Sequence, residues 1–284
     1  MTRFRPGPAT FAPIRAAKQY YEKLRNEGMG LITLLTDFGY RDHYVAALKA
    51  RLLHLAPTLS VIDISHGVES FNIAHAVHVL QNVFREFPIG TAHVIGVADH
   101  GAGPEPGWLA AEFEGHYFVT GDNGILALLA NGTPENLVAL PAAATASPTR
   151  DVLLPAAVAL AQGALLSSLG PAVTTLHQLN NRQLRLQDHR ITGHVAHVDH
   201  YGNLVTNISR TAVDAVGHGR PLAVHFGRDV VRELHPHFSA VPPGEAVVVF
   251  NSQGFLCLAI CQGNASELLG LNFDSQVDVR FQTE

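Results

Sequence analysis

The chain has 284 residues, of which 47% are hydrophobic and 15% are charged. This apolar content is enough for a folded core and excludes a mainly disordered chain. The formal net charge is −5, so the chain lacks the excess of basic side chains that binding to a nucleic-acid backbone requires. We therefore expect no nucleic-acid partner. The 17 histidines are many for this length and stand out as the one unusual feature of the composition.

No apolar run reaches the roughly 18 to 20 residues that span a bilayer, so no membrane-spanning helix is expected. Residues 1–29 carry basic side chains but no apolar segment of the kind found in secretory signals, and are expected to form an N-terminal extension. Cys257 and Cys261 are four residues apart in an expected strand, about 13 Å, which is too far for a disulfide. These features are typical of a reduced, cytoplasmic protein.

The first half of the chain alternates between apolar runs and helical periods. Strands are expected at residues 31–36, 61–64, 91–98, 109–113, 117–119 and 137–140. Helices are expected at residues 44–55, 73–87 and 153–166, the first two ending before Pro57 and Pro88. The order strand, helix, strand, helix, strand predicts an α/β domain over residues 30–180 with a mostly parallel sheet.

The second half of the chain has short strands, many turns and little helical period. Strands are expected at residues 184–186, 191–198, 222–226, 246–250 and 254–261. This pattern predicts a small, mostly antiparallel β domain over residues 190–284. The boundary between the two domains is expected within the polar stretch 177–189.

Polar loops follow three of the expected parallel strands, at the end where such sheets bind ligands. The first loop holds Asp37 and Asp42, the second holds Asp63, and the third begins with Asp99. An Asp after a strand is also a common helix N-cap, so each loop is open to a capping role as well as a ligand-binding one.

A set of short motifs in a fixed order indicates one family. They are Thr36-Asp37-Phe38-Gly39, Asp63-Ile64-Ser65-His66, Asp99-x-Gly101-x-Gly103, Asp122-Asn123-Gly124, Asp199-x-Tyr201-Gly202-Asn203 and Asn251-Ser252-x-Gly254. In this order the chain resembles the S-adenosyl-L-methionine (SAM) hydrolases, or hydroxide adenosyltransferases, and their relatives the 5′-halogenases fluorinase and chlorinase. The resemblance covers residues 31–284. It implies SAM as the substrate, no cofactor, a Rossmann-like N-terminal domain, and a C-terminal β-barrel domain. It also implies a homotrimer with the ligand between the N-terminal domain of one subunit and the C-terminal domain of its neighbour.

In the N-terminal domain, the resemblance implies four substrate-binding residues. Asp37 would bind the ribose hydroxyls, since a carboxylate can accept hydrogen bonds from both O–H groups of a vicinal diol. Phe71 would form an aromatic wall beside the ribose and the sulfonium. Asp42 accompanies the Thr36-Asp37-Phe38-Gly39 motif a few residues later, and Thr149 matches the position of a hydroxyl that contacts halide in the halogenases.

In the C-terminal domain, the resemblance implies four further binding residues. Asp199 would pair with the ammonium group of the methionine moiety, and Ser252 would lie near its carboxylate. Tyr201 would stack on adenine and Asn203 would hold it through its amide.

The catalytic residue implied by the resemblance is Asp99. The family's hydrolases place the attacking water with an Asp, an Arg and a His. Asp99 matches the Asp, but the Arg falls on Pro106 and the His on Pro148. Asp99 is therefore expected to act as the general base, alone or with His100 or His116.

Two other readings of this site stay open. One is a protein that binds SAM or adenosine without catalysis, having lost the family's Arg and His. The other is an enzyme that transfers the adenosyl group to a halide, although a carboxylate at Asp99 would repel that anion.

A metal site is not expected. Imidazoles and a carboxylate cluster in sequence at His194, His197, Asp199 and His200. Strand alternation places His194 and His200 on the face opposite His197 and Asp199, so these side chains would not converge on an ion.

Overall fold

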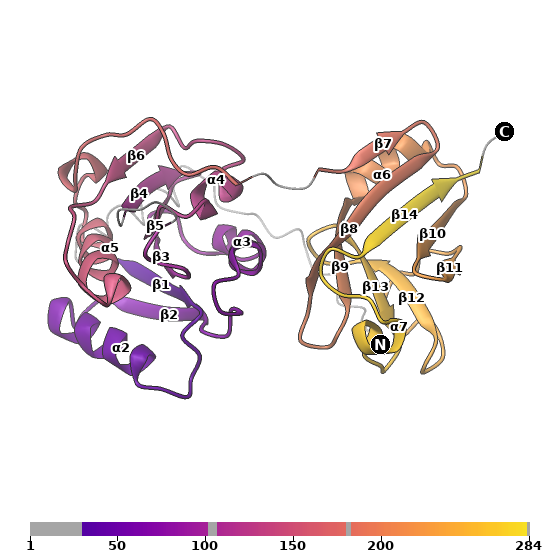
Figure 1. Ribbon diagram of the computed structural model, residues 1–284, viewed down its shortest axis with the longest axis horizontal. Coiled ribbons are helices and arrows are strands. Elements are labelled where there is room, and N and C mark those ends of the chain that lie inside the picture. The colour runs from indigo at the N-terminus through magenta and orange to yellow at the C-terminus, as the bar shows by residue number, and fades with distance from the viewer. Residues whose placement is uncertain (1–29, 102–106, 180–182, 283–284) are drawn as a thin grey trace, which may run out of the picture. The chain divides into compact units, whose positions relative to one another are not determined.

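The chain folds into two compact units, Met1–Asn180 and Asn181–Glu284. Figure 1 shows the computed structural model, which describes residues 30–101, 107–179 and 183–282. The expected N-terminal extension, residues 1–29, and Pro106 lie outside the described residues.

The first unit is built on a six-stranded sheet with the order β2-β1-β3-β5-β4-β6. Its strands are β1 (Leu31–Thr36), β2 (Ser60–Ser65), β3 (Ala92–Gly96), β4 (Trp108–Phe113), β5 (His116–Gly121) and β6 (Asn136–Ala139). The pairs β1·β2, β1·β3 and β3·β5 are parallel, whereas β4 pairs antiparallel with β5 and β6. The predicted α/β class and mostly parallel sheet are confirmed.

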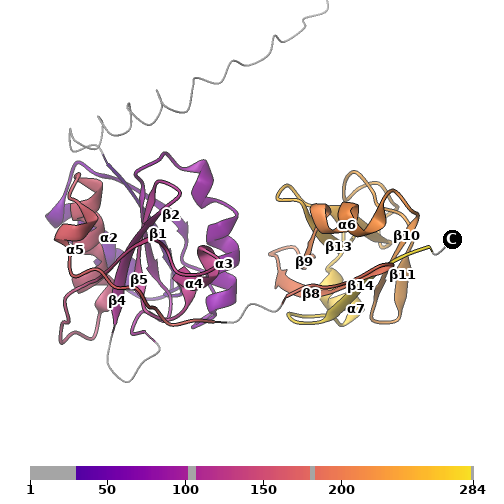
Figure 2. The same ribbon diagram turned by 90° about the horizontal axis from the view of Figure 1, so that it is seen from above.

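Helices cover both faces of this sheet (Figure 2). They are α2 (Tyr44–Leu55) and α5 (Leu154–Ala161) on one face, and α3 (Ile73–Gln81) and α4 (Ile125–Leu129) on the other. Successive side chains of β1 point to opposite faces of the sheet. Leu34 packs into the core on the face covered by α2 and α5, and Leu35 packs into the core on the face covered by α3 and α4.

Two predicted helices of this unit are shorter than expected. Residues 73–87 divide into α3 and a 3₁₀ turn, η1 (Phe84–Glu86), with Asn82 as the C-cap of α3. Residues 153–166 include α5, which ends at Ala161 before Gly163 takes a positive φ of 96°, and a second 3₁₀ turn, η3 (Leu166–Ser168), follows. A π-helical turn, η2 (Thr149–Leu153), leads directly into α5.

The second unit is a nearly closed antiparallel β-barrel, which confirms the antiparallel domain that the sequence pattern predicts and the barrel that the family resemblance implies. Its strands are β7 (Arg185–Gln187), β8 (Arg190–Val198), β9 (Leu204–Ser209), β10 (Leu222–Phe226), β11 (Asp229–Val231), β12 (Ala246–Phe250), β13 (Phe255–Ile260) and β14 (Gln276–Phe281). The order is β11-β10-β14-β8-β9-β13-β12, with β7 on β8, and β11 approaches β12 at the open seam. Two helices, α6 (Arg210–Gly217) and α7 (Ala265–Leu269), complete the unit. The sequence pattern missed both helices and strands β9, β11 and β14.

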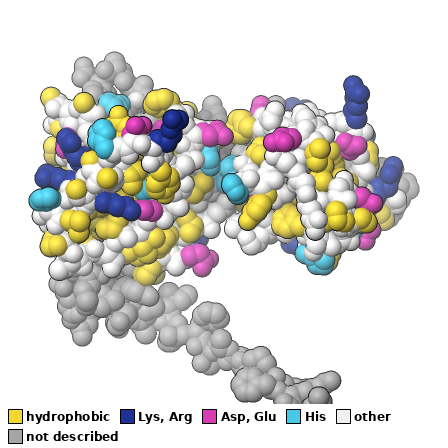
Figure 3. Space-filling model, turned by 90° about the horizontal axis from the view of Figure 1, so that it is seen from below, with side chains coloured by type: hydrophobic (Ala, Val, Ile, Leu, Met, Phe, Trp, Pro, Cys, Tyr) yellow, Lys and Arg dark blue, Asp and Glu magenta, His cyan; other side chains and the backbone are white. Residues whose placement is uncertain are grey.

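The surface of the described residues is mixed in character. On the face drawn in Figure 3, Lys and Arg side chains are scattered among hydrophobic and uncharged ones. Within the described ranges, no helix is both long enough and apolar enough to cross a bilayer.

Candidate active site

The carboxyl ends of β1, β2 and β3 meet at one edge of the first unit's sheet, where a cavity of about 560 Å³ opens. The loops after these three strands bring Asp37, Phe71 and Asp99 to the cavity. Other side chains at its wall are His43, Tyr44, His100, Ser147, Pro148 and Arg150. Residues far apart in the sequence therefore converge where an open parallel sheet binds its ligands.

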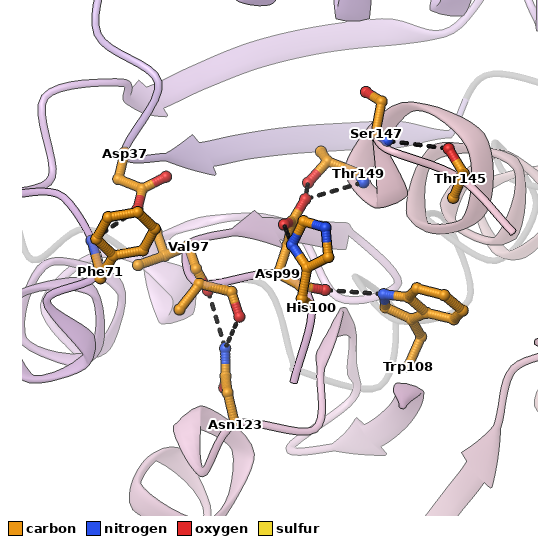
Figure 4. Close-up of polar contacts among 11 residues, drawn as sticks. Asp37, Phe71, Val97, Asp99, His100, Trp108, Asn123, Thr145, Ser147 and Thr149 are labelled. Atoms are coloured by element: carbon orange, nitrogen blue, oxygen red, sulfur yellow. Dashed lines mark hydrogen bonds and ion pairs between the residues drawn. The ribbon is translucent and has the colours of Figure 1, made fainter. Parts of the chain in front are cut away.

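The Asp99 carboxylate is buried and is contacted by Thr149 and His100 (Figure 4). Its Oδ2 accepts hydrogen bonds from the Thr149 backbone N–H at 3.1 Å and from Thr149 Oγ1 at 2.5 Å. Its Oδ1 lies 3.0 Å from Nδ1 of His100. Because Thr149 is the first residue of η2, its backbone N–H at the start of this helical segment points at the carboxylate.

The backbone around Asp99 is fixed by two side chains from neighbouring elements (Figure 4). Trp108 Nε1 donates to the Asp99 carbonyl at 2.8 Å. Asn123 Nδ2 donates to the carbonyls of Val97 and Ala98 at 2.9 and 3.1 Å. These bonds hold Ala98 at a φ of 47°, a left-handed conformation that costs a non-glycine residue about 1 kcal/mol or more. Trp108 belongs to none of the sequence motifs, and the one sequence signal for it is that it is the chain's single tryptophan and follows the Asp99 loop.

Asp37 and Phe71 contact each other at the wall of the cavity. The Phe71 backbone N–H donates to Asp37 Oδ2 at 2.8 Å, and Phe71 itself has a φ of 62°. This bond stabilises a strained conformation that projects the Phe71 ring outward, with 77% of the residue exposed. Asp37 Oδ1 has no hydrogen bond to any residue that the structure describes, so it is available to a ligand.

A chain of polar contacts supports the loop that carries Asp37. Lys49 Nζ donates to Asp63 Oδ2 at 2.6 Å, and Asp63 Oδ1 lies 3.3 Å from Nε2 of the fully buried His66. His66 Nδ1 in turn lies 2.7 Å from Thr36 Oγ1. The Asp63 and His66 side chains of the second motif therefore hold the first motif in place rather than facing the cavity.

Arg150 places a cation at the cavity wall. Its guanidinium donates to both oxygens of Asp151 at 2.8 and 2.9 Å. This guanidinium, together with the Thr145 hydroxyl, lowers the pKa of Asp151 to about 2. The pair therefore stays ionised across the physiological pH range.

Two candidate residues of the first unit do not line this cavity. Asp42 is exposed ahead of α2 and is absent from the cavity wall. Thr149 is fully buried behind Asp99, with its hydroxyl proton donated to that carboxylate.

A second cavity, of about 570 Å³, lies in the barrel unit and is lined by Asp199, Tyr201 and Asn203. Asp199 organises the β8–β9 turn, because its Oδ1 accepts from the backbone N–H groups of Tyr201 and Asn203, both at 2.9 Å. Its Oδ2 accepts from Asn203 Nδ2 at 2.9 Å. The Tyr201 ring is presented to the outside, with 75% of the residue exposed. The carboxylate expected to pair with an ammonium group is thus occupied in holding the turn.

Ser252 lies apart from this second cavity. It is exposed in the turn between β12 and β13, whereas Asn203 adjoins the other end of β13. The pairings of Phe255 with Ser209 and of Leu258 with Leu204 place these two turns at opposite ends of β9, about 20 Å apart at roughly 3.4 Å per residue.

Comparisons with known proteins identify the family. The model of the SAM hydroxide adenosyltransferase N-terminal domain matches residues 32–170, and that of the C-terminal domain matches residues 193–278. The chain belongs to the SAM hydroxide adenosyltransferase family. An (R)-S-adenosyl-L-methionine hydrolase of Salinispora tropica is 32% identical over 84% of this chain and 94% of its own length. A fluorinase of Nocardia brasiliensis is 26% identical over 81% of this chain and 89% of its own. A crystal structure of an uncharacterized conserved protein from Thermotoga maritima has a TM-score of 0.79, 28% identity, and covers 88% of this chain and 99% of that one.

Among the histidines considered as helpers of Asp99, this family member places only His100 at the cavity. His116 begins β5, at the opposite edge of the sheet, and its Nδ1 lies 3.2 Å from Nε2 of the buried His93. The alternative in which His116 acts with Asp99 is therefore wrong. Pro148 does line the cavity, so a proline stands where the resemblance places the family's histidine.

Among the described residues, no three His, Cys, Asp or Glu side chains come together as a set of possible metal ligands. Cys257 and Cys261 are both buried, and burial raises the pKa of the Cys257 thiol to about 12. This thiol therefore stays protonated and packs as a small apolar side chain.

Gly96→Ala is expected to disturb the Asp99 site directly. A Cβ at this position would lie 2.5 Å from Thr149 Oγ1 and 3.2 Å from Thr36 Cγ2, and both threonines are fully buried. We expect a loss of about 1 to 3 kcal/mol in the free energy of unfolding, measured by urea denaturation. Gly67→Ala is the matched control, since its nearest contact is 3.7 Å away. Equal stability of the two variants would contradict this packing argument.

Proposed function

We propose that this protein hydrolyses SAM, with water attacking the ribose C5′ so that adenosine and L-methionine are released. The observation that carries the proposal is the buried Asp99 carboxylate, held by Thr149 beside a cavity that Asp37 and Phe71 also line. The name of the Salinispora relative, an (R)-S-adenosyl-L-methionine hydrolase, supports the same reaction. SAM is the substrate, and the reaction needs no cofactor.

The chemistry explains why few side chains suffice. The electron pair of the C5′–S bond moves to sulfur, so the sulfonium leaves as a neutral thioether and no general acid is required. What the protein supplies is a site that holds water in line with C5′ and accepts its proton. Positive charge on the sulfur is lost in the transition state, and a cavity that excludes bulk water favours this step.

Transfer to a halide is the second candidate reaction, because Thr149 matches a halide-contacting hydroxyl. Here the Thr149 hydroxyl donates to Asp99 at 2.5 Å, so its proton is not free for an anion. The Asp99 carboxylate would also repel a halide 4 Å away by about 4 kcal/mol at an effective dielectric constant of 20. Water is the nucleophile that this site favours.

Incubation with SAM in water enriched in ¹⁸O tests the proposed function. Chromatography and mass spectrometry are expected to find adenosine and methionine in equal amounts, with ¹⁸O in the 5′-hydroxyl. Intact SAM that stays bound without turnover would identify a binding protein instead. A 5′-halo-adenosine that forms only when halide is added would identify a halide transferase.

We also propose that the active assembly is a homotrimer, in which the barrel unit of one subunit completes the site on the first unit of its neighbour. Each unit carries only part of a SAM site: Asp37 and Asp99 in the first, Tyr201 and Asn203 in the second. The residues Phe71 and Tyr201 are 77% and 75% exposed, as expected of aromatic side chains that become covered when a ligand binds. Ser252, in the turn beside the far end of β9, would contribute its hydroxyl to the shared site.

Mixing two inactive variants tests this shared site. Asp99→Asn disables the part of the site on the first unit, and Asn203→Ala disables the part on the barrel unit. Each variant alone is therefore expected to be inactive. When equal amounts are dissociated and reassembled, about one site in four receives both intact halves, so about a quarter of wild-type activity should return. Light scattering gives the mass of the assembly, and no recovery in a confirmed mixed oligomer would contradict a site shared between subunits.

Asp37→Ala is expected to raise KM for SAM by about 10- to 100-fold, with kcat within about threefold, because hydrogen bonds to a charged acceptor are worth roughly 1.5 to 3 kcal/mol. Steady-state release of adenosine measures both constants. Asp42→Asn is the comparison on the same loop, and its KM should stay at the wild-type value because Asp42 lies outside the cavity. A larger effect from Asp42 than from Asp37 would contradict the assignment of the ribose-binding carboxylate.

A further inference from the structure

We infer that His100, rather than Asp99, is the base that takes the proton from the attacking water, and that Asp99 positions it. This inference rests on the proposed hydrolysis and concerns the chemistry of the same cavity. It starts from the geometry of the Asp99 carboxylate, whose two oxygens are both engaged by neighbouring groups (Figure 4).

Asp99 is poorly placed to accept another proton. Its Oδ2 already accepts two hydrogen bonds from Thr149, and its Oδ1 faces His100 Nδ1 at 3.0 Å. The residue is only 8% exposed. Both carboxylate oxygens therefore already face hydrogen-bonding groups, and the Asp99 side chain is 11% exposed whereas that of His100 is 64% exposed, so Asp99 offers an incoming water molecule much less surface.

The same contact fixes the tautomer of His100. An ionised carboxylate can only accept hydrogen bonds, so the imidazole must carry its proton on Nδ1 where it faces Asp99. The lone pair of the neutral ring is then on Nε2. A carboxylate that holds an imidazole in this way orients it and stabilises the imidazolium that forms when Nε2 takes a proton.

His100 is also accessible to water and substrate. Its side chain is 64% exposed, and the residue lines the cavity together with Asp37 and Phe71. The other titratable or charged side chains at this cavity are His43, Tyr44, Asp99 and Arg150. His43 is the only other imidazole there among the described residues, and it stacks on Tyr44 with ring centroids 4.6 Å apart, without a carboxylate partner in the described contacts.

The proposed step balances as follows. The water oxygen forms a bond to C5′ as the C5′–S bond breaks, and the bonding pair leaves with sulfur to give uncharged methionine thioether. One water proton passes to His100 Nε2 and the other stays on the new 5′-hydroxyl of adenosine. The imidazolium then releases its proton to solvent, which restores the neutral base.

The pH dependence of adenosine release tests this inference. For the wild type, kcat/KM should fall toward acid pH and level off at higher pH, because a base must be unprotonated to accept the water proton. His100→Gln should lower kcat by about 10²- to 10⁴-fold and abolish this acid limb, and added imidazole should restore part of the rate. Adenosine affinity, measured by calorimetry, should stay within about threefold, because the exposed ring is not needed for folding.

Two further histidine variants sharpen the result. His54→Gln changes an exposed histidine at the end of α2, outside the cavity, and should keep both the rate and the acid limb. His43→Gln should keep the acid limb whatever its rate. An acid limb that survives in His100→Gln, or that disappears in His43→Gln, overturns the assignment of the base. A wild-type protein that releases no adenosine overturns the proposed function and this inference with it.

Discussion

Asp99→Asn is expected to lower kcat for adenosine release by about 10²- to 10⁴-fold, while adenosine affinity stays within about threefold. The two Thr149 donors must face an acceptor, so the new amide would turn its oxygen toward them and its NH₂ toward His100. An NH₂ donates to Nδ1 of the imidazole and thereby places the ring proton on Nε2. The nitrogen that should accept a proton from water would then carry one already.

Single-turnover release of adenosine measures this loss without interference from product release. Thr149→Ser is the matched control, because it retains both the backbone N–H and the hydroxyl that hold Asp99, and its kcat should stay within about threefold of wild type. Full activity in Asp99→Asn would rule out any role for this carboxylate in the chemical step. A parallel loss of adenosine affinity would show instead that Asp99 shapes the cavity.

The sequence correctly predicts the strands and helices that a single local pattern specifies. Strand β1 and helix α2 occupy the residues predicted for them, because a continuous apolar run and a helical period ended by Pro57 admit few alternatives. The helix expected over residues 73–87 breaks, since Phe84 is fully buried among aromatic rings and the chain must turn to place it there. That packing depends on residues far away in the sequence.

In the barrel unit, polar motifs obscured a strand. Thr206 and Asn207 closely follow the Asp199-x-Tyr201-Gly202-Asn203 motif and are polar, yet they lie within β9, where Thr206 Oγ1 donates to the Leu256 carbonyl. Strand β14, in contrast, shows a clear period of two in its sequence, in which Val277 and Val279 are fully buried and alternate with polar residues.

The sequence predicts those parts of the candidate site that depend only on neighbouring strands or neighbouring residues. Asp37, Phe71 and Asp99 converge because consecutive parallel strands end at one edge of the sheet. The contact of His100 with Asp99 follows from their adjacency. The position of Ser252 depends on the order and register of the barrel strands, which no short motif encodes.

The pairing of His93 with His116 likewise depends on register, and it makes the stability of the first unit sensitive to pH. His93 is fully buried between Thr33, whose Oγ1 lies 2.7 Å from its Nδ1, and His116, 3.2 Å from its Nε2. Burial, with a smaller contribution from His116, lowers the pKa of His93 to about 3. Burial also lowers the pKa of His116, against an opposing effect of Glu114. Both rings are therefore neutral in the folded protein at neutral pH.

A decrease in pH from 7 to 5 is therefore expected to reduce the free energy of unfolding by about 2 kcal/mol through His93 alone. The folded pKa lies below the unfolded value of about 6.5, so this contribution is complete above pH 6.5 and is lost progressively as the pH falls toward 3. Urea denaturation followed by the fluorescence of Trp108, the only tryptophan and a buried residue of this unit, measures the effect.

His93→Gln supplies the decisive comparison, because an amide can still contact Thr33 and His116 but does not titrate. Its stability at pH 7 should be lower, since the ring also stacks on Phe118 with centroids 5.0 Å apart, but its dependence on pH between 7 and 5 should be shallower. His54→Gln, at an exposed position, should reproduce the wild-type slope. Parallel pH profiles for the wild type and His93→Gln would show that the buried imidazole does not control acid stability, because the linkage requires the slope to change with the titrating group.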